Sequence, residues 1–489
     1  MSAPSRGHRR GSAGRRLASN TGWRLGAFGA RTVGGLTVTI LVARTEGPFG
    51  LGRFQFALAL TLLLSFLVTL GLQKQLVREL ARRPDQARDR VDAALLLALG
   101  AGLIVTLAVL GFGEALDVDV GLVLIAMLAL IADSATRIVM ALFWALERMK
   151  YETVSVGIQE AAFVGLTIPA LSAGLGARGA LLAYLASRVV GLLVAWVVAA
   201  TKLGCPTRPR WVPGVMLPTL RSTVPFAVDD GLSLAYIRVD AVMLGAFRGQ
   251  TAVGLYQAAT NLVLYLNILP RMLNMSMYPQ MSRAWPDHAS ELRRLRDFSL
   301  RLLGLVSMPI AVGSFLLAPR ILELVYGPGF ERAVIVYQLL APIIPIRMLG
   351  NTLGTALTSV DRQTQRTVAV GVAAAANVAL NVVLIPRWSI VGAAVATLIT
   401  ETGLFVAYAV LLRRVLGRSS LLSAVAIPGL ACVPLALVVI ALSAAPLAPV
   451  IVAAAIAFGI AISGIALGLM PRPVLAPKAV VSSLLRWSP

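Results

Sequence analysis

Histidine and cysteine are nearly missing from this chain, and so is any polar stretch long enough to fold as a soluble domain. The 489 residues contain two histidines, His8 and His288, and two cysteines, Cys205 and Cys432, which are far apart in the sequence. This scarcity argues against a metal cluster and against a disulfide framework. The chain also has no G-x-x-x-x-G-K-[ST] segment, the phosphate-cradling loop of ATP hydrolysis. We therefore expect no metal, no cofactor and no enzymatic activity.

Acidic residues are also few, with 22 Asp and Glu against 44 Lys and Arg, for a formal net charge of +22. In a soluble protein this excess would favour nucleic-acid binding. Here 58% of the residues are hydrophobic and the mean hydropathy is +0.82, whereas soluble domains are about 45–50% apolar. The composition predicts a polytopic membrane protein whose cytoplasmic loops collect Lys and Arg, and no nucleic-acid partner.

Apolar runs near the roughly 20 residues that a bilayer core requires recur along the chain. They predict an all-α protein with about fourteen transmembrane helices, at residues 21–43, 51–72, 91–112, 120–145, 153–173, 179–201, 217–247, 251–281, 298–317, 333–356, 366–385, 389–412, 421–442 and 446–470. Loops rich in Lys and Arg alternate with loops poor in them. This alternation predicts a multi-pass protein of the cytoplasmic (inner) membrane with both termini in the cytoplasm.

Two internal repeats predict how these helices are grouped. The segment GLGRFQFALA from Gly50 matches AVGLYQAATN from Ala252, and RGALLAYLASRVVGLLVAW from Arg178 matches VGAAVATLITETGLFVAY from Val391. The matched segments lie six predicted helices apart, so the two halves have the same orientation in the membrane. We expect two pseudo-symmetric six-helix lobes and a C-terminal helix pair. The predicted units are a basic cytoplasmic N-terminus (1–20), an N-lobe (21–204), an inter-lobe loop (205–216), a C-lobe (217–414), the last two helices (415–470) and a cytoplasmic tail (471–489).

Arginines inside the predicted helices are the candidate substrate-binding residues, because each charge at the bilayer centre costs roughly 2.5–3.5 kcal/mol and requires a reason. The predicted cavity cations are Arg24, Arg31, Arg53, Arg188, Arg271 and Arg347. Arg24 and Arg31 are seven residues apart and share a helix face. Arg31 has no acid within a turn of its own helix, which makes it the first candidate for a ligand-facing cation. Arg53 and Arg271 lie near helix ends, where snorkelling toward water is the alternative.

A second group of charged residues is a candidate for ion coupling or gating: Glu160, Asp229, Asp230, Arg238, Asp240 and Glu401. Asp240 is predicted nearer the outer surface, where a role at the helix end is the alternative. Asp133 and Arg137 are four residues apart, a spacing that favours a structural ion pair. Arg188 and Glu401 occupy matched positions of the second repeat, which allows an ion pair between the two lobes.

Three segments show a family resemblance: IRVDAVMLGAF with TAVGLYQAA, ILELVYGPGF from Ile321, and LNVVLIPRWSIVGAAVATLITE from Leu380. They resemble Wzx-type polysaccharide flippases of the multidrug/oligosaccharidyl-lipid/polysaccharide (MOP) superfamily. The resemblance implies two lobes around a cavity that opens alternately to each side. It also implies that undecaprenyl-pyrophosphate-linked oligosaccharide moves from the cytoplasmic to the outer leaflet, with membrane lipids, a polysaccharide polymerase and glycosyltransferases as partners. Arginine suits this substrate because a guanidinium binds phosphate through paired N–H donors.

Other functions remain open at this level. A flippase for the peptidoglycan lipid precursor also carries arginine on its first helix, but the fuller pattern, an arginine followed closely by an acid, is absent here. A multidrug or cation antiporter of the same superfamily would depend on acids in the cavity. A polymerase or ligase normally needs a large outer loop, and the outer loops here are short. A lipid scramblase would show no headgroup preference.

Overall fold

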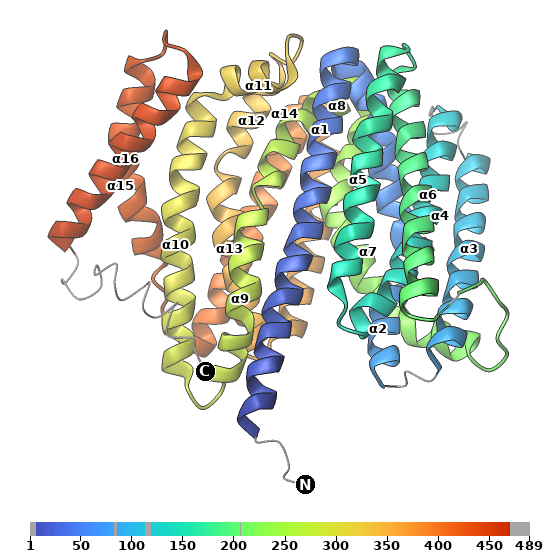
Figure 1. Cartoon of the computed structure of the whole chain (residues 1–489). Coiled ribbons are helices and arrows are strands. Elements are labelled where there is room, and N and C mark those ends of the chain that lie inside the picture. Colours follow the sequence, from blue (N-terminus) through green and yellow to red (C-terminus); the bar gives the residue numbers. More distant parts are fainter. Residues whose placement is uncertain (1–5, 83–85, 113–118, 206, 470–489) are drawn as a thin grey trace.

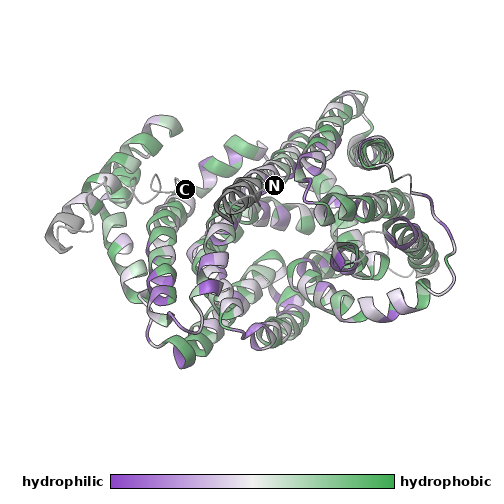
Figure 2. Ribbon diagram, turned by 60° about the horizontal axis from the view of Figure 1, so that its bottom comes forward, coloured by the Kyte–Doolittle hydropathy of each residue, from purple (hydrophilic) through white to green (hydrophobic). Residues whose placement is uncertain are grey.

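The computed structural model describes residues 6–82, 86–112, 119–205 and 207–469. All regular elements in these ranges are α-helices, and they stand side by side as a bundle (Figure 1). Hydrophobic residues recur along the helices, and hydrophilic residues form shorter stretches between them (Figure 2). The all-α polytopic prediction is confirmed.

Two helices are too long for a single membrane crossing. α1 (Arg6–Thr69) has 64 residues and α14 (Gln363–Leu416) has 54. At about 1.5 Å per residue each would exceed the ~30 Å bilayer core at least twofold if it were straight. Each is interrupted by one residue with positive φ, Gly47 (φ 64°) in α1 and Ser389 (φ 51°) in α14. Each therefore supplies two of the predicted spans, with the breaks where the sequence predicts loops.

The other long segments agree with the predicted spans within about four residues, except that α10 (Ala289–Leu316) begins nine residues before its predicted start at residue 298. They are α3 (Ala87–Phe112), α4 (Val120–Ala145), α5 (Met149–Ser172), α6 (Gly176–Lys202), α7 (Met216–Arg248), α8 (Gln250–Tyr265) continued by α9 (Ile268–Ala284), α10 (Ala289–Leu316), α12 (Ala333–Leu340) continued by α13 (Ile343–Ser359), α15 (Leu421–Ala441) and α16 (Leu447–Leu469). Eleven helices in the described ranges are long and apolar enough to cross a membrane. With α1 and α14 counted twice and the more polar α7 added, the total is fourteen.

Two short helices replace segments that the sequence analysis assigned to loops. α2 (Leu72–Arg82) buries Leu72, Leu76 and Leu80 and exposes its basic residues. α11 (Ala318–Tyr326) lies at the opposite end of the bundle (Figure 1). Both are amphipathic and too short to span a bilayer, so a search for long apolar runs misses them.

Close packing between helices fixes the region around α1. α1 packs on α5, α7 and α8, and α7 packs on α14. A Cβ on Gly34 of α1 would lie 2.8 Å from Oε2 and 3.0 Å from Cβ of Glu160 on α5, so α1 and α5 approach each other closely here. At the C-terminal pair, a Cβ on Gly304 of α10 would overlap the Ala424 carbonyl oxygen of α15. The boundaries of the two lobes stay a prediction, and the predicted tail 471–489 lies outside the described residues.

Candidate functional site

One face of α1 carries the most concentrated group of predicted cations. Arg24, Phe28 and Arg31 follow one another at spacings of four and three residues, so they share this face. The Arg271 guanidinium carbon lies 5.1 Å from the centre of the Phe28 ring, which brings α9 against α1. The Arg24 guanidinium carbon lies 4.4 Å from the centre of the Trp144 ring on α4. Three of the six predicted cavity cations are thus gathered around Phe28.

Arg31 is a candidate cation that forms no ion pair among the residues that the structure describes. Within the described ranges its side chain forms no hydrogen bond and no ion pair, and its Nε is buried without a partner. A buried donor without a partner costs about 1–3 kcal/mol, and more when it is charged. Arg24 and Arg271 likewise form no ion pair in the described part of the chain; their contacts are with aromatic rings. These three guanidiniums therefore keep their positive charge available.

Arg137 and Arg188, two other arginines of the first half, are paired with acids. Arg137 Nε lies 2.7 Å from Oδ2 of Asp133, the contact that the sequence spacing favours. Arg188 lies 3.1 Å from Oε1 of Glu160 and 3.7 Å from Oδ1 of Asp133. Its guanidinium carbon also stands 4.4 Å from the centre of the Tyr184 ring. Arg188 and Glu160 therefore hold each other, and neither is a free ligand-facing charge in this structure.

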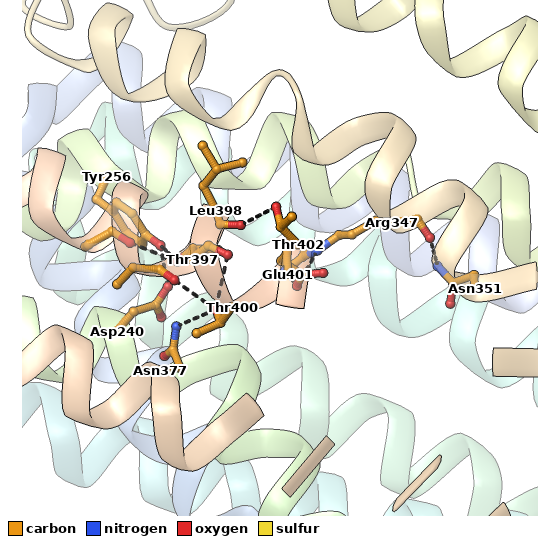
Figure 3. Close-up of polar contacts among 12 residues, drawn as sticks. Asp240, Tyr256, Arg347, Asn351, Asn377, Thr397, Leu398, Thr400, Glu401 and Thr402 are labelled. Atoms are coloured by element: carbon orange, nitrogen blue, oxygen red, sulfur yellow. Dashed lines mark hydrogen bonds and ion pairs between the residues drawn. The ribbon is translucent and has the colours of Figure 1, made fainter. Parts of the chain in front are cut away.

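The predicted ion pair between Arg188 and Glu401 is wrong. Glu401 of α14 instead pairs with Arg347 of α13, with an N–O distance of 2.6 Å (Figure 3). Arg188 finds its acids on α4 and α5. Matched positions in a repeat give two residues equivalent surroundings within their own halves, so each residue pairs with a neighbour from its own half.

Asp240 is the centre of a polar network in the second half. Asp240 lies eight residues before α7 ends at Arg248, is buried, and accepts a hydrogen bond from the Tyr256 hydroxyl (Figure 3). Its predicted position nearer the outer surface stays a prediction. The Tyr256 hydroxyl also lies 3.1 Å from Oγ1 of Thr397. Thr400 continues the network with a hydrogen bond to the Thr397 carbonyl, and it accepts one from Asn377. Asp240 forms no ion pair with any described residue, and its hydrogen bonds come from neutral groups.

The other candidates of this group have different surroundings. Asp230 lies 2.7 Å from Nζ of Lys74, which joins α7 to α2. Arg238 is half-buried two residues before Asp240 and forms no ion pair within the residues that the structure covers. The side chain of Asp229 lies outside the described residues.

Arg53 is paired with Asp119, at the end of the bundle that holds α11. The pair lines a cavity of about 280 Å³ together with Phe49, Phe56 and Gln250. Burial raises the pKa of the Asp119 carboxyl, but the Leu122 N–H and the Arg53 guanidinium lower it more, so the net pKa is below its usual value. Arg53 therefore acts as a partner of Asp119 in this structure.

The two halves meet at the same end through the first repeat. A Cβ on Gly52 would overlap the Gln250 carbonyl oxygen, and a Cβ on Gly254 would overlap the Pro48 carbonyl oxygen. The equivalent glycines Gly52 and Gly254 therefore face each other in direct backbone contact. We call this contact between residues 48–52 and 250–254 the glycine seam.

Arginines stand beside the seam in both halves. Arg44 donates to the Leu324 carbonyl and, at 3.0 Å, to the Val325 carbonyl of α11, so it connects the first half to the second. Arg248 donates to the Pro386 carbonyl and, at 3.3 Å, to the Ile385 carbonyl, both within the second half. The two arginines make the same kind of bond, and only Arg44 crosses between the halves.

The sequence analysis did not identify Phe28, Trp144, Glu152 or Arg44. Glu152 is buried and accepts a 2.7 Å hydrogen bond from Nε1 of Trp144. Phe28 was detectable, since it lies four residues after Arg24. Trp144 was not, because it is 120 residues from Arg24 and only the packing of α4 on α1 brings them together.

The helical bundle and its long apolar helices define a multi-pass membrane protein. The structure is similar to the Lipid II flippase MurJ in an inward closed conformation, with a TM-score of 0.76 and 13% identity over 92% of this chain and 99% of MurJ. It is also similar to a multidrug resistance MATE family transporter in an inward-facing conformation, with a TM-score of 0.68 and 12% identity over 79% of this chain and 94% of that one.

The chain belongs to the polysaccharide biosynthesis protein family, whose model matches residues 17–285. Two proteins of Haloferax volcanii match parts of it. "Probable flippase AglR" is 30% identical over 180 residues, which are 36% of this chain and 37% of AglR. "Probable low-salt glycan biosynthesis flippase Agl15" is 26% identical over 164 residues, 33% of this chain and 34% of Agl15. The chain thus aligns with about a third of the length of each relative.

Proposed function

We propose that this protein is a flippase that moves an undecaprenyl-pyrophosphate-linked oligosaccharide from the cytoplasmic to the outer leaflet for cell-surface polysaccharide synthesis. The observation that carries the proposal is the unpaired cationic face of α1, with Arg31 at its centre. A diphosphate headgroup supplies the anionic acceptors that Arg24, Arg31 and Arg271 lack in the described chain. Membership of the polysaccharide biosynthesis family and the flippase names of the two relatives support the same substrate class.

The mechanism that we propose is alternating access of the two lobes. The glycine seam and Arg44 join the halves at the α11 end, and the Lys74–Asp230 pair joins them at the α2 end. The cations Arg24 and Arg31 lie on α1, between these two ends of the bundle. Movement of a headgroup across the membrane requires the contacts at one end to open while those at the other end hold.

We propose that both termini and the α2 end face the cytoplasm of the inner membrane. α2 and the start of α10 lie at the same end of the bundle (Figure 1), and both expose basic side chains, Arg78 and Arg82 on α2 and Arg293 and Arg294 on α10. Positive residues favour the cytoplasmic side. A polymerase and glycosyltransferases are the proposed partners, because the flipped unit must be made on one side and joined on the other.

Energy for uphill transport is proposed to enter through Asp240. It is a buried carboxylate without an ion pair in the described ranges, and its hydrogen bonds come from the Tyr256 hydroxyl of α8 and from the Ala241 N–H of its own helix. A bound proton or a bound monovalent cation would neutralise the Asp240 carboxylate. Glu160 and Glu401 are less suited, since Arg188 and Arg347 already neutralise them.

Flipping of a fluorescent undecaprenyl-pyrophosphate-linked oligosaccharide in proteoliposomes tests the proposal. We expect the wild-type protein to accelerate flipping and Arg31→Ala to lose it by about 100-fold, since a charged hydrogen bond is worth about 1.5–3 kcal/mol. Arg31→Lys should keep part of the rate because it keeps the charge. The melting temperature of Arg31→Ala should not fall, because no described group pairs with Arg31. Flipping by Arg31→Ala at the wild-type rate would remove Arg31 from the site.

A further inference from the structure

Two arginines of the first half rest on aromatic rings at the same distance but with different neighbours. The Arg24 guanidinium carbon lies 4.4 Å from the Trp144 ring centre, and that of Arg188 lies 4.4 Å from the Tyr184 ring centre. Arg188 is also paired with Glu160. Arg24 forms no ion pair in the part of the chain that the structure describes. For Arg24 the ring is therefore the principal contact that fixes the guanidinium.

An aromatic ring holds a cation in a way that suits anion binding. The ring face attracts a guanidinium through its quadrupole and carries no net negative charge. A carboxylate would also hold the arginine, but it would neutralise the charge and occupy the N–H donors that a phosphate needs. The contact with Trp144 thus limits the freedom of Arg24 while its donors stay available.

The ring of Trp144 is itself held in place. Trp144 lies in the last turn of α4, and its Nε1 donates a 2.7 Å hydrogen bond to Oε2 of Glu152, which is 6% exposed in the first turn of α5. The next residue of α5, Thr153, donates to the Trp23 carbonyl beside Arg24. The Thr153 methyl group would also lie 3.2 Å from a Cβ on Gly26. The segment of α1 around Arg24 is therefore anchored to the start of α5.

We propose that Trp144 is a positioning residue for the anionic headgroup: its ring fixes Arg24 so that the guanidinium donors meet the substrate diphosphate, and Glu152 sets the angle of the ring. This inference rests on the proposed function, because it assigns the diphosphate as the group that Arg24 binds. It predicts that loss of the ring acts on substrate affinity through Arg24.

The test uses the purified full-length protein in detergent, with geranylgeranyl diphosphate as the probe and its dissociation constant as the readout. We expect Trp144→Leu and Arg24→Gln each to weaken binding by about tenfold, and the double variant to be no weaker than either, since the two residues act as one unit. Trp144→Phe keeps a ring face and should bind within about threefold of the wild type. Tyr184→Leu is the matched control and should bind like the wild type, because Glu160 still holds Arg188.

The outcomes separate the inference from the proposed function. If the wild type binds the diphosphate and Trp144→Leu binds it equally well, Trp144 has no positioning role while the flippase proposal stands. Additive losses in the double variant would also overturn the inference. If the wild type binds no diphosphate, both the inference about Trp144 and the proposed function are contradicted. Should Trp144→Leu not fold, Glu152→Leu replaces it: binding about threefold weaker supports the inference, and unchanged binding overturns it.

Discussion

Around α1, Arg24 and Arg31 have no carboxylate partner among the described residues, whereas in the second half Arg347 is held by Glu401. There Asp240 is a buried carboxylate whose described hydrogen-bond partners are neutral, and Arg238, two residues earlier on α7, also forms no ion pair among the described residues. The unpaired charges around α1 are therefore cations, whereas those of the second half include a carboxylate. Because a buried charge is costly without a counter-charge, this difference supports the proposal that α1 receives an anionic headgroup and that Asp240 receives a proton or a small cation.

The largest effect on stability should come from removing one partner of the Arg347–Glu401 ion pair. Glu401→Ala leaves the largely buried Arg347 without its partner, and removal of one member of a buried ion pair costs about 3–5 kcal/mol. Arg31→Ala removes a cation that has no partner to lose. Thermal unfolding in detergent should therefore show a large fall in melting temperature for Glu401→Ala and none for Arg31→Ala. Equal falls would show that Arg31 is also structurally paired.

The next effect concerns energy coupling. Asp240→Asn keeps an acceptor for the Tyr256 hydroxyl but removes the charge, so transport should no longer respond to an imposed proton or sodium gradient. We expect the gradient to change the initial flipping rate of the wild type by about tenfold and that of Asp240→Asn by less than about twofold. Asp230→Asn is the control, because Asp230 already has Lys74 as a partner. A full gradient response in Asp240→Asn would exclude Asp240 as the coupling site.

A smaller effect is expected from the loss of hydrogen bonds that join the two halves, compared with matched hydrogen bonds inside one half. Arg44→Ala removes the hydrogen bonds that tie α1 to α11, which are worth about 1.5–3 kcal/mol as bonds to a charged donor. Backbone amides of α11 should then exchange hydrogen at least about tenfold faster. Arg248→Ala, which removes matched bonds inside the second half, should leave α11 unchanged. If both variants leave α11 protected, Arg44 does not hold that end closed.

The smallest effect should come from the exposed Arg53–Asp119 pair, since exposed ion pairs contribute about 0–1 kcal/mol. The pKa of Asp119 is lowered in the folded protein. Its stabilisation is therefore present above the unfolded pKa and is lost as the pH falls through the folded pKa. Asp119→Asn should lower the melting temperature slightly at neutral pH and not in strong acid. A large change at neutral pH would mean that the pair is essential to the seam end.

The candidate site was only partly predictable. Arg31 was identified from sequence because the absence of an acid within one helical turn is a local property. The partners of Arg188 and Glu401 were predicted wrongly, because they come from residues 28 and 54 positions away and depend on which helices pack together. The hydrogen bond between Asp240 and Tyr256 was not predicted for a related reason, since it follows from the contact of α7 with α8. The roles of all these residues stay predictions.

The sequence by itself determined the membrane-spanning helices, the breaks near Gly47 and Ser389, and the repeat that pairs Gly52 with Gly254, because hydrophobic length and local residue pattern decide these features. Only the tertiary structure decided that the paired glycines touch each other and that the Trp144 ring, not a carboxylate, contacts the Arg24 guanidinium. It also decided which arginines form an ion pair with an acid. These outcomes depend on distances between helices that are far apart in the chain. Sequence periodicity fixes which face of a helix is buried, and helix packing fixes what that face meets.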